Sequence, residues 1–196
     1  ALGGKEMLLN KSVSGPAIAT SLKIAKYEPW FAPGEDVPRG IFADVIQGGD
    51  TIRVFNVHLQ SVGLIGDDYE AVREGPDAEQ SKRLFSRLSS AYVARATQAR
   101  AVRKEVDSSP HPVILLGDFN DTPVSFTLST LKGSSSTELF DAFSKGGVGL
   151  GATYVGDVSG LRIDYILYAD KFELHSFNTY PVELSDHRPI SAVFSY

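Results

Sequence analysis

Short blocks of apolar residues, in places alternating with polar ones, recur along most of the chain. This pattern is typical of β-strands, and it predicts strands over residues 17–25, 40–47 and 51–58. The Gly-Gly-Asp stretch at 48–50 separates the last two and predicts a tight hairpin turn. The same pattern predicts later strands over residues 112–116, 163–168, 172–180 and 189–194.

One segment between these strands has a helical period. Over residues 77–106 the pattern predicts a long amphipathic helix with an apolar stripe of Leu84, Leu88, Ala91, Ala99, Val102 and Val106. Arg95 falls on that stripe, where an apolar residue is expected. Two interpretations stay open, a salt-bridged or snorkelling arginine and an arginine directed at an anionic substrate. A shorter helix is predicted over residues 123–131, with Thr122 as its cap.

The order of these elements predicts an α/β (α+β) sandwich built by a single domain over residues 1–196. Hydrophobic residues make up 42% of the chain, which excludes a disordered protein. The absence of cysteine excludes a disulfide framework, a thiol nucleophile and a cysteine-ligated zinc site. No apolar run reaches the ~18 residues of a membrane-spanning helix and no signal peptide is visible, so we expect a soluble domain, whose localisation the sequence leaves unknown. Any membrane anchor would lie upstream of this chain.

Polar side chains gather at the ends of predicted strands, where open sheets place their sites. Alternation puts Asn56, His58 and Gln60 on one face of a strand, as either a solvated face or the wall of a site. Asp118 and Asn120 follow a buried strand and lie two residues apart in a tight turn. Their side chains can converge on one point, where they suit a nucleophilic water or a hard cation. The alternative is an Asx turn that caps the next helix.

Two further clusters pair acids with a histidine. Asp164 lies inside an otherwise apolar strand, where an unpaired carboxylate is costly. Its partner is either a histidine or the nearby Arg162. Asp186 and His187 adjoin just before the last predicted strand, and neighbours in an extended chain point in opposite directions. Asp186 then suits a hard cation, and His187 suits Asp164, which would orient its ring for acid–base catalysis.

Taken together and in this order, these clusters resemble the endonuclease/exonuclease/phosphatase (DNase I-like) superfamily, and in particular a bacterial branch of it. The matching stretches are Asn-Val-His-Leu-Gln at 56–60, Gly-Asp-Phe-Asn at 117–120, Arg-Ile-Asp-Tyr-Ile-Leu at 162–167 and Ser-Asp-His-Arg-Pro at 185–189. A Thr153-Tyr154 pair adds to the likeness. The resemblance implies two facing, mostly antiparallel sheets flanked by helices. It also implies a metal-dependent phosphoesterase that hydrolyses a phosphodiester or phosphomonoester with an activated water.

The resemblance further implies a role for each matching residue. His58 would contact the scissile phosphate or assist the leaving group, and Asp118 and Asn120 would position the attacking water and the phosphate. Asp164 would orient His187, which is the base or a phosphate-stabilising imidazolium. The candidate substrate-binding residues are Asn56, Arg95 and Tyr154.

The metal site implied by the resemblance lacks one ligand in this sequence. Asp186 and Asp118 would hold Mg²⁺ or Mn²⁺, but the family's main ligand is a Glu in a Gln-Glu pair that ends an early strand. No such pair precedes Gly15, and Glu6 does not fit the position. We therefore expect a domain truncated at its N-terminus, with weak metal affinity and impaired activity. The alternative is a non-catalytic interaction module that has retained the fold.

Charge bears on the substrate. The formal net charge of −5 argues against binding bulk DNA by charge alone, but it allows an enzyme that meets phosphate through a bound cation. We therefore place nucleic acid below a phosphorylated small molecule or a lipid head group, and a nuclease acting on DNA or RNA stays an alternative. The sequence contains no evidence for a protein partner.

Overall fold

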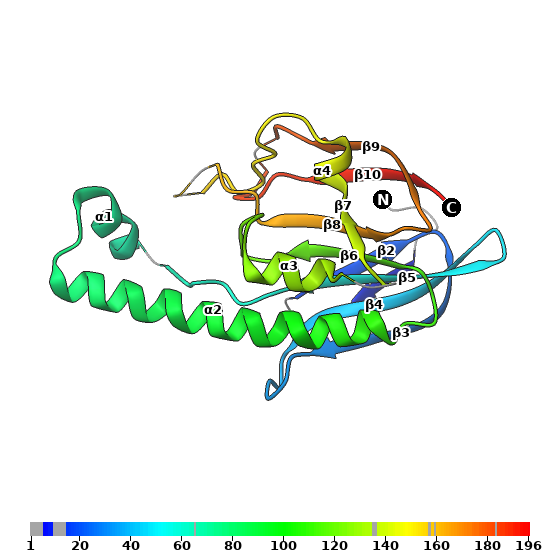
Figure 1. The fold of residues 1–196 in the computed structure, drawn as a ribbon, viewed down its shortest axis with the longest axis horizontal. Helices are drawn as coiled ribbons and strands as arrows, with labels where there is room; N and C mark the ends of the chain where they lie inside the picture. The colour runs from blue at the N-terminus through cyan, green and yellow to red at the C-terminus, as the bar shows by residue number, and fades with distance from the viewer. Residues whose placement is uncertain are drawn as a thin grey trace.

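A six-stranded sheet in the order β3-β4-β5-β6-β8-β7 forms the centre of the computed structural model (Figure 1). The structure describes residues 6–9, 15–64, 66–134, 137–156, 158, 160–182 and 184–196. The strands of this sheet are β3 (Lys23–Phe31), β4 (Pro38–Gln47), β5 (Asp50–His58), β6 (Val113–Asp118), β7 (Leu139–Asp141) and β8 (Asp164–Ala169). All neighbours are antiparallel except β5 and β6, which run parallel and therefore end at the same edge of the sheet.

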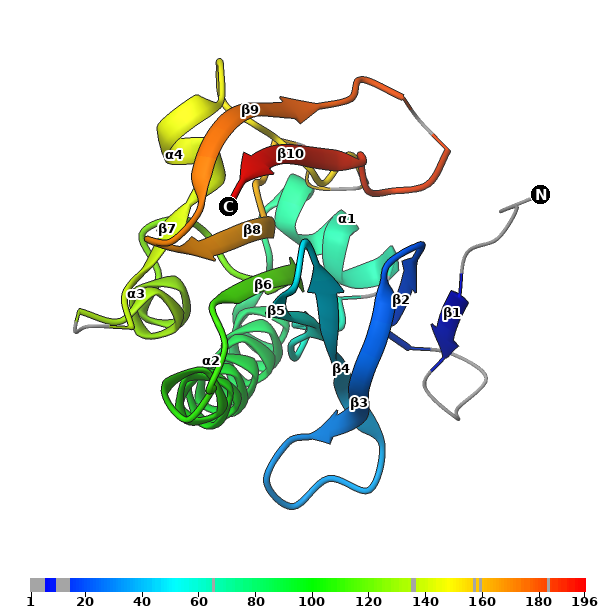
Figure 2. The same ribbon diagram turned by 90° about the vertical axis from the view of Figure 1, so that its right-hand side faces the viewer.

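Helices cover one face of this sheet and short strands cover the other (Figure 2). The helical face carries α2 (Ala78–Asp107) and α3 (Phe126–Lys132), while α1 (Gly66–Glu74) packs on α2. The second layer contains the pair β1 (Glu6–Leu9) and β2 (Ala17–Thr20), the pair β9 (Glu173–Thr179) and β10 (Ile190–Ser195), and α4 (Ala142–Gly146). The predicted α/β sandwich with a second sheet and flanking helices is confirmed. Within the described residues, no helix combines the length and the apolar character needed to cross a bilayer.

Each face of the central sheet contributes to a separate core, because successive residues of a strand point to opposite sides. Phe55 and Leu115 pack toward the helices with Val102 of α2. Ile41 and Ile166 pack toward the second layer. The strands β6 and β8 read as near-continuous apolar runs because both of their faces pack against other elements.

The second layer covers the flanks of the sheet more fully than its centre. β2 lies against β4, and β10 lies against β8. On this face Ile41 of β4 and Ile166 of β8 are buried, whereas Val54 of β5 and Ile114 and Leu116 of β6 are only half-buried. The centre of a sheet is ordinarily its most buried part, so within the described ranges this layer leaves part of the core accessible to water.

The long helix closely follows its prediction. Asp77 is its N-cap and forms a capping box with Gln80, which satisfies two backbone N–H groups at the helix start. All of the strands predicted from residue 40 onward are also found, with ends shifted by up to two residues.

Two predicted boundaries are wrong. The strand predicted over residues 17–25 is two strands, β2 and β3, because the chain turns where the Leu22 N–H donates to Thr20 Oγ1. The helix predicted over residues 123–131 begins at Phe126, and its cap is Ser125 instead of Thr122. The pattern also did not predict β1, β7, α1 or α4, which are short and carry little periodicity.

Neighbouring leucines in β6 test the uneven covering of the sheet. We expect Leu115→Ala to lower the free energy of unfolding by ~2–5 kcal/mol, because the removed side chain leaves a cavity in the closed core. Leu116→Ala removes the same atoms from the half-covered face and should cost clearly less. Urea unfolding of both variants measures the difference. Equal losses would mean that both faces are closed to the same degree.

Candidate active site

Three of the predicted catalytic residues form one row across neighbouring strands. In the strand register His58 of β5 lies opposite Asp118 of β6, and Asp118 lies opposite Asp164 of β8. Gly117 precedes Asp118 with φ +136°, and a Cβ at that position would lie 1.9 Å from the Val57 carbonyl oxygen. Only glycine fits such a close approach, so the backbone itself brings the ends of β5 and β6 together.

His187, from the loop before β10, completes the cluster. Its Nδ1 lies 2.8 Å from Asp164 Oδ2, and its Nε2 lies 4.0 Å from Asp118 Oδ2. On the other side of Asp118, His58 Nε2 lies 3.6 Å from the same carboxylate oxygen. Asp164 thus pairs with a histidine, while the alternative partner Arg162 pairs with Asp141 at 2.9 Å.

Asp118 and Asn120 do converge, through a tight turn of their own. The Asn120 N–H donates to Asp118 Oδ1 at 2.8 Å, and Asn120 Nδ2 donates to Asp118 Oδ2 at 2.9 Å. Asn120 adopts φ +52°, which asparagine tolerates better than most residues. This is the geometry of an Asx turn, but the turn does not cap α3, whose cap is Ser125. The carboxylate and amide therefore stay at the edge of the sheet beside both histidines.

The electrostatics of the cluster favour a bound positive charge. Burial, followed by repulsion from Asp164, raises the pKa of Asp118, although the Asn120 N–H and the two histidines oppose the shift. The pKa of His187 is also raised, chiefly because its ring hydrogen-bonds to Asp164. Asp118, Asp164 and His187 each offer one ligand atom within 4.8 Å of the others, so they could together hold a metal ion. Two carboxylates and one imidazole suit a divalent cation.

Thr153 and Tyr154 hold the acid and the histidine in place. Thr153 Oγ1 accepts the backbone N–H groups of Ile163 and Asp164, both at 3.1 Å, and the Thr153 carbonyl accepts the N–H of Arg188 at 2.7 Å. The ring of Tyr154 packs edge-on against His187 with centroids 5.3 Å apart. The sequence indicated Thr153 only through the resemblance to the family. Its role as a hydrogen-bond acceptor could not be predicted, because the fully buried hydroxyl links segments that are distant in the chain.

Arg95 has a structural role that the sequence left open. Its side chain is 1% exposed, and its Nε lies 3.1 Å from Asp121 Oδ2. Its NH1 donates to the Gln60 carbonyl at 2.8 Å. Arg95 thus joins the loop after β5 to the loop after β6. The salt-bridged interpretation is the one found, and the assignment of Arg95 to direct substrate contact is corrected because its guanidinium does not reach the surface.

Asn56 and Asp186 also lie apart from the cluster. Asn56 Nδ2 donates to the Ala17 carbonyl at 2.9 Å, which joins β5 to β2, and a substrate contact by Asn56 stays a prediction. Asp186 is exposed and does not belong to the group of convergent ligand atoms, in which Asp164 stands beside Asp118. The structure thus adds Asp164 as a candidate metal ligand beside Asp118. Direct metal binding by Asp186 stays a prediction.

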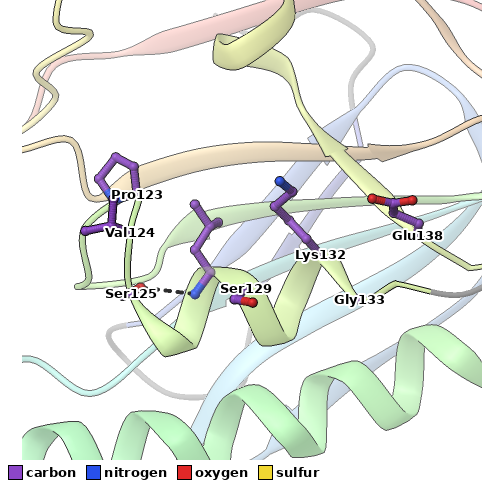
Figure 3. Close-up of a pocket in the computed structure, with 8 residues that line it drawn as sticks. Pro123, Val124, Ser125, Ser129, Lys132, Gly133 and Glu138 are labelled. Carbon is purple, nitrogen blue, oxygen red and sulfur yellow. Dashed lines mark hydrogen bonds between the residues drawn. The ribbon is translucent and has the colours of Figure 1, made fainter.

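Two hollows lie near these loops without containing the cluster. One of about 230 Å³ runs along α3, where Ser125, Ser129 and Lys132 are among its lining residues (Figure 3). The other, of about 350 Å³, separates α2 from the loop after β5 and reaches Gln60. None of the predicted catalytic residues lines either hollow. Exposure within the cluster is uneven: the side chain of His58 is 53% exposed, whereas those of Asp118 and Asp164 are each 18% exposed.

Comparison with known proteins agrees with this arrangement. The model of the Endonuclease/Exonuclease/phosphatase family matches residues 9–187, which include the whole cluster. The chain belongs to this family. A search of curated proteins finds no significant match.

Solved structures with the same fold include several members of the endonuclease/exonuclease/phosphatase family. A mannosyl-6-phosphatase from Bacteroides thetaiotaomicron is 19% identical with a TM-score of 0.62, and the match covers 92% of this chain and 70% of that one. A 3′ phosphatase from Neisseria, bound to a product DNA hairpin, is 21% identical with a TM-score of 0.61, covering 92% and 74%. A humanized TDP2 from D. rerio is 18% identical with a TM-score of 0.61, covering 89% and 68%. At these identities the likeness establishes the fold.

The pairing of His187 with Asp164 gives a pH-dependent prediction for the metal-free protein. Asp164→Asn removes the charge that raises the pKa of His187, so this pKa should fall toward the ordinary value near 6.5. In the unaltered protein the pair stabilises the fold below that pH, and this contribution is lost as pH rises through the raised pKa. NMR titration of the ring measures the shift. Asp186→Asn is the matched control and should lower the pKa less, since Asp186 contributes least.

The buried hydroxyl of Thr153 gives a second prediction. Thr153→Val keeps the shape but leaves the N–H groups of Ile163 and Asp164 without their acceptor, so we expect a loss of ~1–3 kcal/mol in unfolding free energy. Thr153→Ser keeps the acceptor and should recover most of the loss. Denaturant unfolding measures both. If the serine variant is as unstable as the valine variant, the Thr153 methyl group contributes the stability and the hydroxyl does not.

Proposed function

We propose that this protein is a metal-dependent phosphoesterase that hydrolyses a phosphodiester or phosphomonoester by attack of water. The observation that carries the proposal is the convergence of Asp118, Asp164 and His187, with His58 beside Asp118 at 3.6 Å. These groups come from β5, β6, β8 and the loop before β10. An ion pair with a purely structural role would need only two of these four groups, so it does not explain why all four converge.

Each residue of the cluster has a chemical task in this proposal. Asp118 accepts a hydrogen bond from the attacking water, and Asn120 holds that carboxylate in one orientation through two hydrogen bonds. Asp164 holds Nδ1 of His187, so the Nε2–H of the imidazolium is the donor left for a phosphate oxygen or the leaving oxygen. His58 offers a second donor from the exposed side of the row.

The ligand atoms of the cluster suit Mg²⁺ or Mn²⁺, but they are few in number. A divalent cation held by Asp118 and Asp164 would offset their mutual repulsion, which contributes to the raised pKa of Asp118. When bound, it would neutralise negative charge on the phosphate and on the leaving oxygen. Hard cations prefer six or more oxygen ligands, and two carboxylates supply few of them. We therefore propose weak metal binding and impaired activity for this chain.

The substrate is a phosphorylated small molecule, a lipid head group or a nucleic acid in this proposal. Solved structures with the same fold include a mannosyl-6-phosphatase and a 3′ phosphatase bound to a product DNA hairpin, which supports a phosphoester without selecting one. His58 is the most exposed group of the cluster, so a phosphate would approach the half-buried carboxylates from its side.

Metal titration together with a generic substrate tests the proposal. We expect Mn²⁺ to bind weakly and to support slow hydrolysis of bis-p-nitrophenyl phosphate, both measured on the purified chain. His187→Ala should reduce the rate by ~10²–10⁴, the usual contribution of an acid–base group, while leaving Mn²⁺ binding largely in place. Asp118→Ala should abolish both.

Tyr180→Phe, which removes only a surface hydroxyl hydrogen-bonded to Ser191, is the control and should change neither quantity. Binding of Mn²⁺ without any hydrolysis that depends on His187 would favour the non-catalytic module. Tight binding of Mn²⁺ would contradict the proposed shortage of ligands.

A further inference from the structure

The long helix α2 differs in charge from the rest of the molecule. The chain has a net charge of −5, yet no Asp or Glu occurs between Gln80 and Lys104. Its cations there are Lys82, Arg83, Arg87, Arg95, Arg100, Arg103 and Lys104. Four of them pair with carboxylates, since Arg83 and Arg87 meet Asp68, Arg95 meets Asp121, and Arg103 meets Asp107. Lys82, Arg100 and Lys104 are exposed to solvent.

Exposed aromatic rings lie among these cations. Phe85 is 74% exposed, Tyr92 is 52% exposed, and Phe126 at the start of α3 is 54% exposed. Seven residues separate Phe85 from Tyr92, which places them on one side of the helix about 10 Å apart. The guanidinium of Arg100 lies 4.8 Å from the centre of the Phe126 ring, so Phe126 adjoins the same helix. Lys82, Phe85, Tyr92, Arg100 and Phe126 are called the α2 aromatic face below.

Packing in the core explains the buried aromatic rings, but it does not explain Phe85, Tyr92 and Phe126, which are exposed. Ala99 lies one heptad beyond Tyr92 on the same side of α2 and is fully buried. The C-terminal half of the helix packs on the sheet and α3, whereas the N-terminal half extends past the strand ends (Figure 1). Large apolar side chains left exposed together, in a setting of polar residues, mark an interaction surface.

The α2 aromatic face is linked to the loop that carries Asp118 through two buried residues. The guanidinium of Arg95 lies 4.6 Å from the centre of the Tyr92 ring and pairs with Asp121, three residues after Asp118. Phe126 lies at the end of the same loop, which runs from β6 to α3. Through Arg95 and Asp121 this face is therefore joined to the loop that follows Asp118.

We infer that the α2 aromatic face binds single-stranded nucleic acid, with bases stacked on Phe85, Tyr92 and Phe126 and phosphates near Lys82 and Arg100. Aromatic rings set in a cationic groove are how proteins bind single strands without reading sequence. The inference extends the proposed function and rests on it for catalysis, because the strand would supply the phosphodiester. Binding itself can be measured without hydrolysis.

The observations favour a single strand over a duplex or a membrane. A duplex keeps its bases stacked inside, so it cannot offer them to separated rings. A flat anionic bilayer would meet the acidic remainder of the protein as well as the face, whereas a flexible strand can follow one cationic stripe. The apolar part of the face also includes Leu88, which lies between Phe85 and Tyr92 and is 37% exposed, so the vesicle measurement below is a necessary arm of the test.

Fluorescence polarisation in EDTA tests the inference, because no hydrolysis can occur without metal. The probes are a labelled 20-nucleotide oligothymidylate, an abasic oligomer with the same number of phosphates, and a mixed-sequence duplex. Vesicles of phosphatidylserine and phosphatidylcholine are tested by co-sedimentation. We expect the oligothymidylate to bind at least about fivefold more tightly than the abasic oligomer, the lower end of the contribution of one base–aromatic stack.

Variants then locate the binding surface. Phe85→Ala and Tyr92→Ala should each weaken oligothymidylate binding at least about fivefold, and Tyr92→Phe should restore it. Tyr27→Ala is the matched control, since Tyr27 lies on β3 and is 51% exposed, and it should bind normally. Both alanine variants are checked by circular dichroism and thermal unfolding, and Phe85→Ala removes a ring that contributes little to the core.

Each other outcome overturns the inference. Equal binding of the abasic oligomer would indicate attraction by charge alone, and preferential binding of vesicles would make the face a membrane contact. Unchanged binding by folded Phe85→Ala and Tyr92→Ala would move the contact elsewhere. Adding Mn²⁺ separates this inference from the proposed function: a strand that binds without being cut, in a protein that also leaves bis-p-nitrophenyl phosphate intact, contradicts the phosphoesterase, and a model phosphodiester cut without strand binding contradicts the α2 aromatic face.

Discussion

The close approach of β5 and β6 at Gly117 is the constraint on which the candidate site depends. No side chain fits there, because a Cβ would lie 1.9 Å from the Val57 carbonyl oxygen. The parallel register that follows puts His58 beside Asp118, and the antiparallel partner β8 adds Asp164. Groups separated by about a hundred residues in the chain thereby become neighbours without any long connecting structure, on strands that the core holds rigid.

A buried polar network beneath this row keeps the two loops aligned. Arg95 joins Asp121 to the Gln60 carbonyl, and Gln98 accepts the Gln60 N–H at 2.8 Å. Thr127 also donates to the Asp121 carboxylate at 2.7 Å. Burying this ion pair costs desolvation energy that the pair regains only with such additional hydrogen bonds. The network thus holds the loops of the site in a defined position more than it adds to the stability of the fold.

Charge is distributed unevenly around the same edge of the sheet. The carboxylates of Asp118 and Asp164 concentrate negative charge at the reactive end, which suits a cation, while α2 carries positive charge alongside it. The overall value of −5 averages over these regions and is a poor guide to either. Local fields near a site, with low-dielectric protein behind them, decide what a phosphate encounters.

The sequence by itself determined the long helix, most of the central strands and the set of polar residues at their ends, because periodicity and capping are local properties of the chain. It left open whether Asp164 meets Arg162 or His187, and whether Arg95 faces a ligand or a carboxylate. It paired Asp118 with Asp186, whereas strand register pairs it with Asp164. Only the tertiary structure decides such partnerships, since they depend on which strands lie side by side and on where buried groups find hydrogen-bond acceptors across the fold.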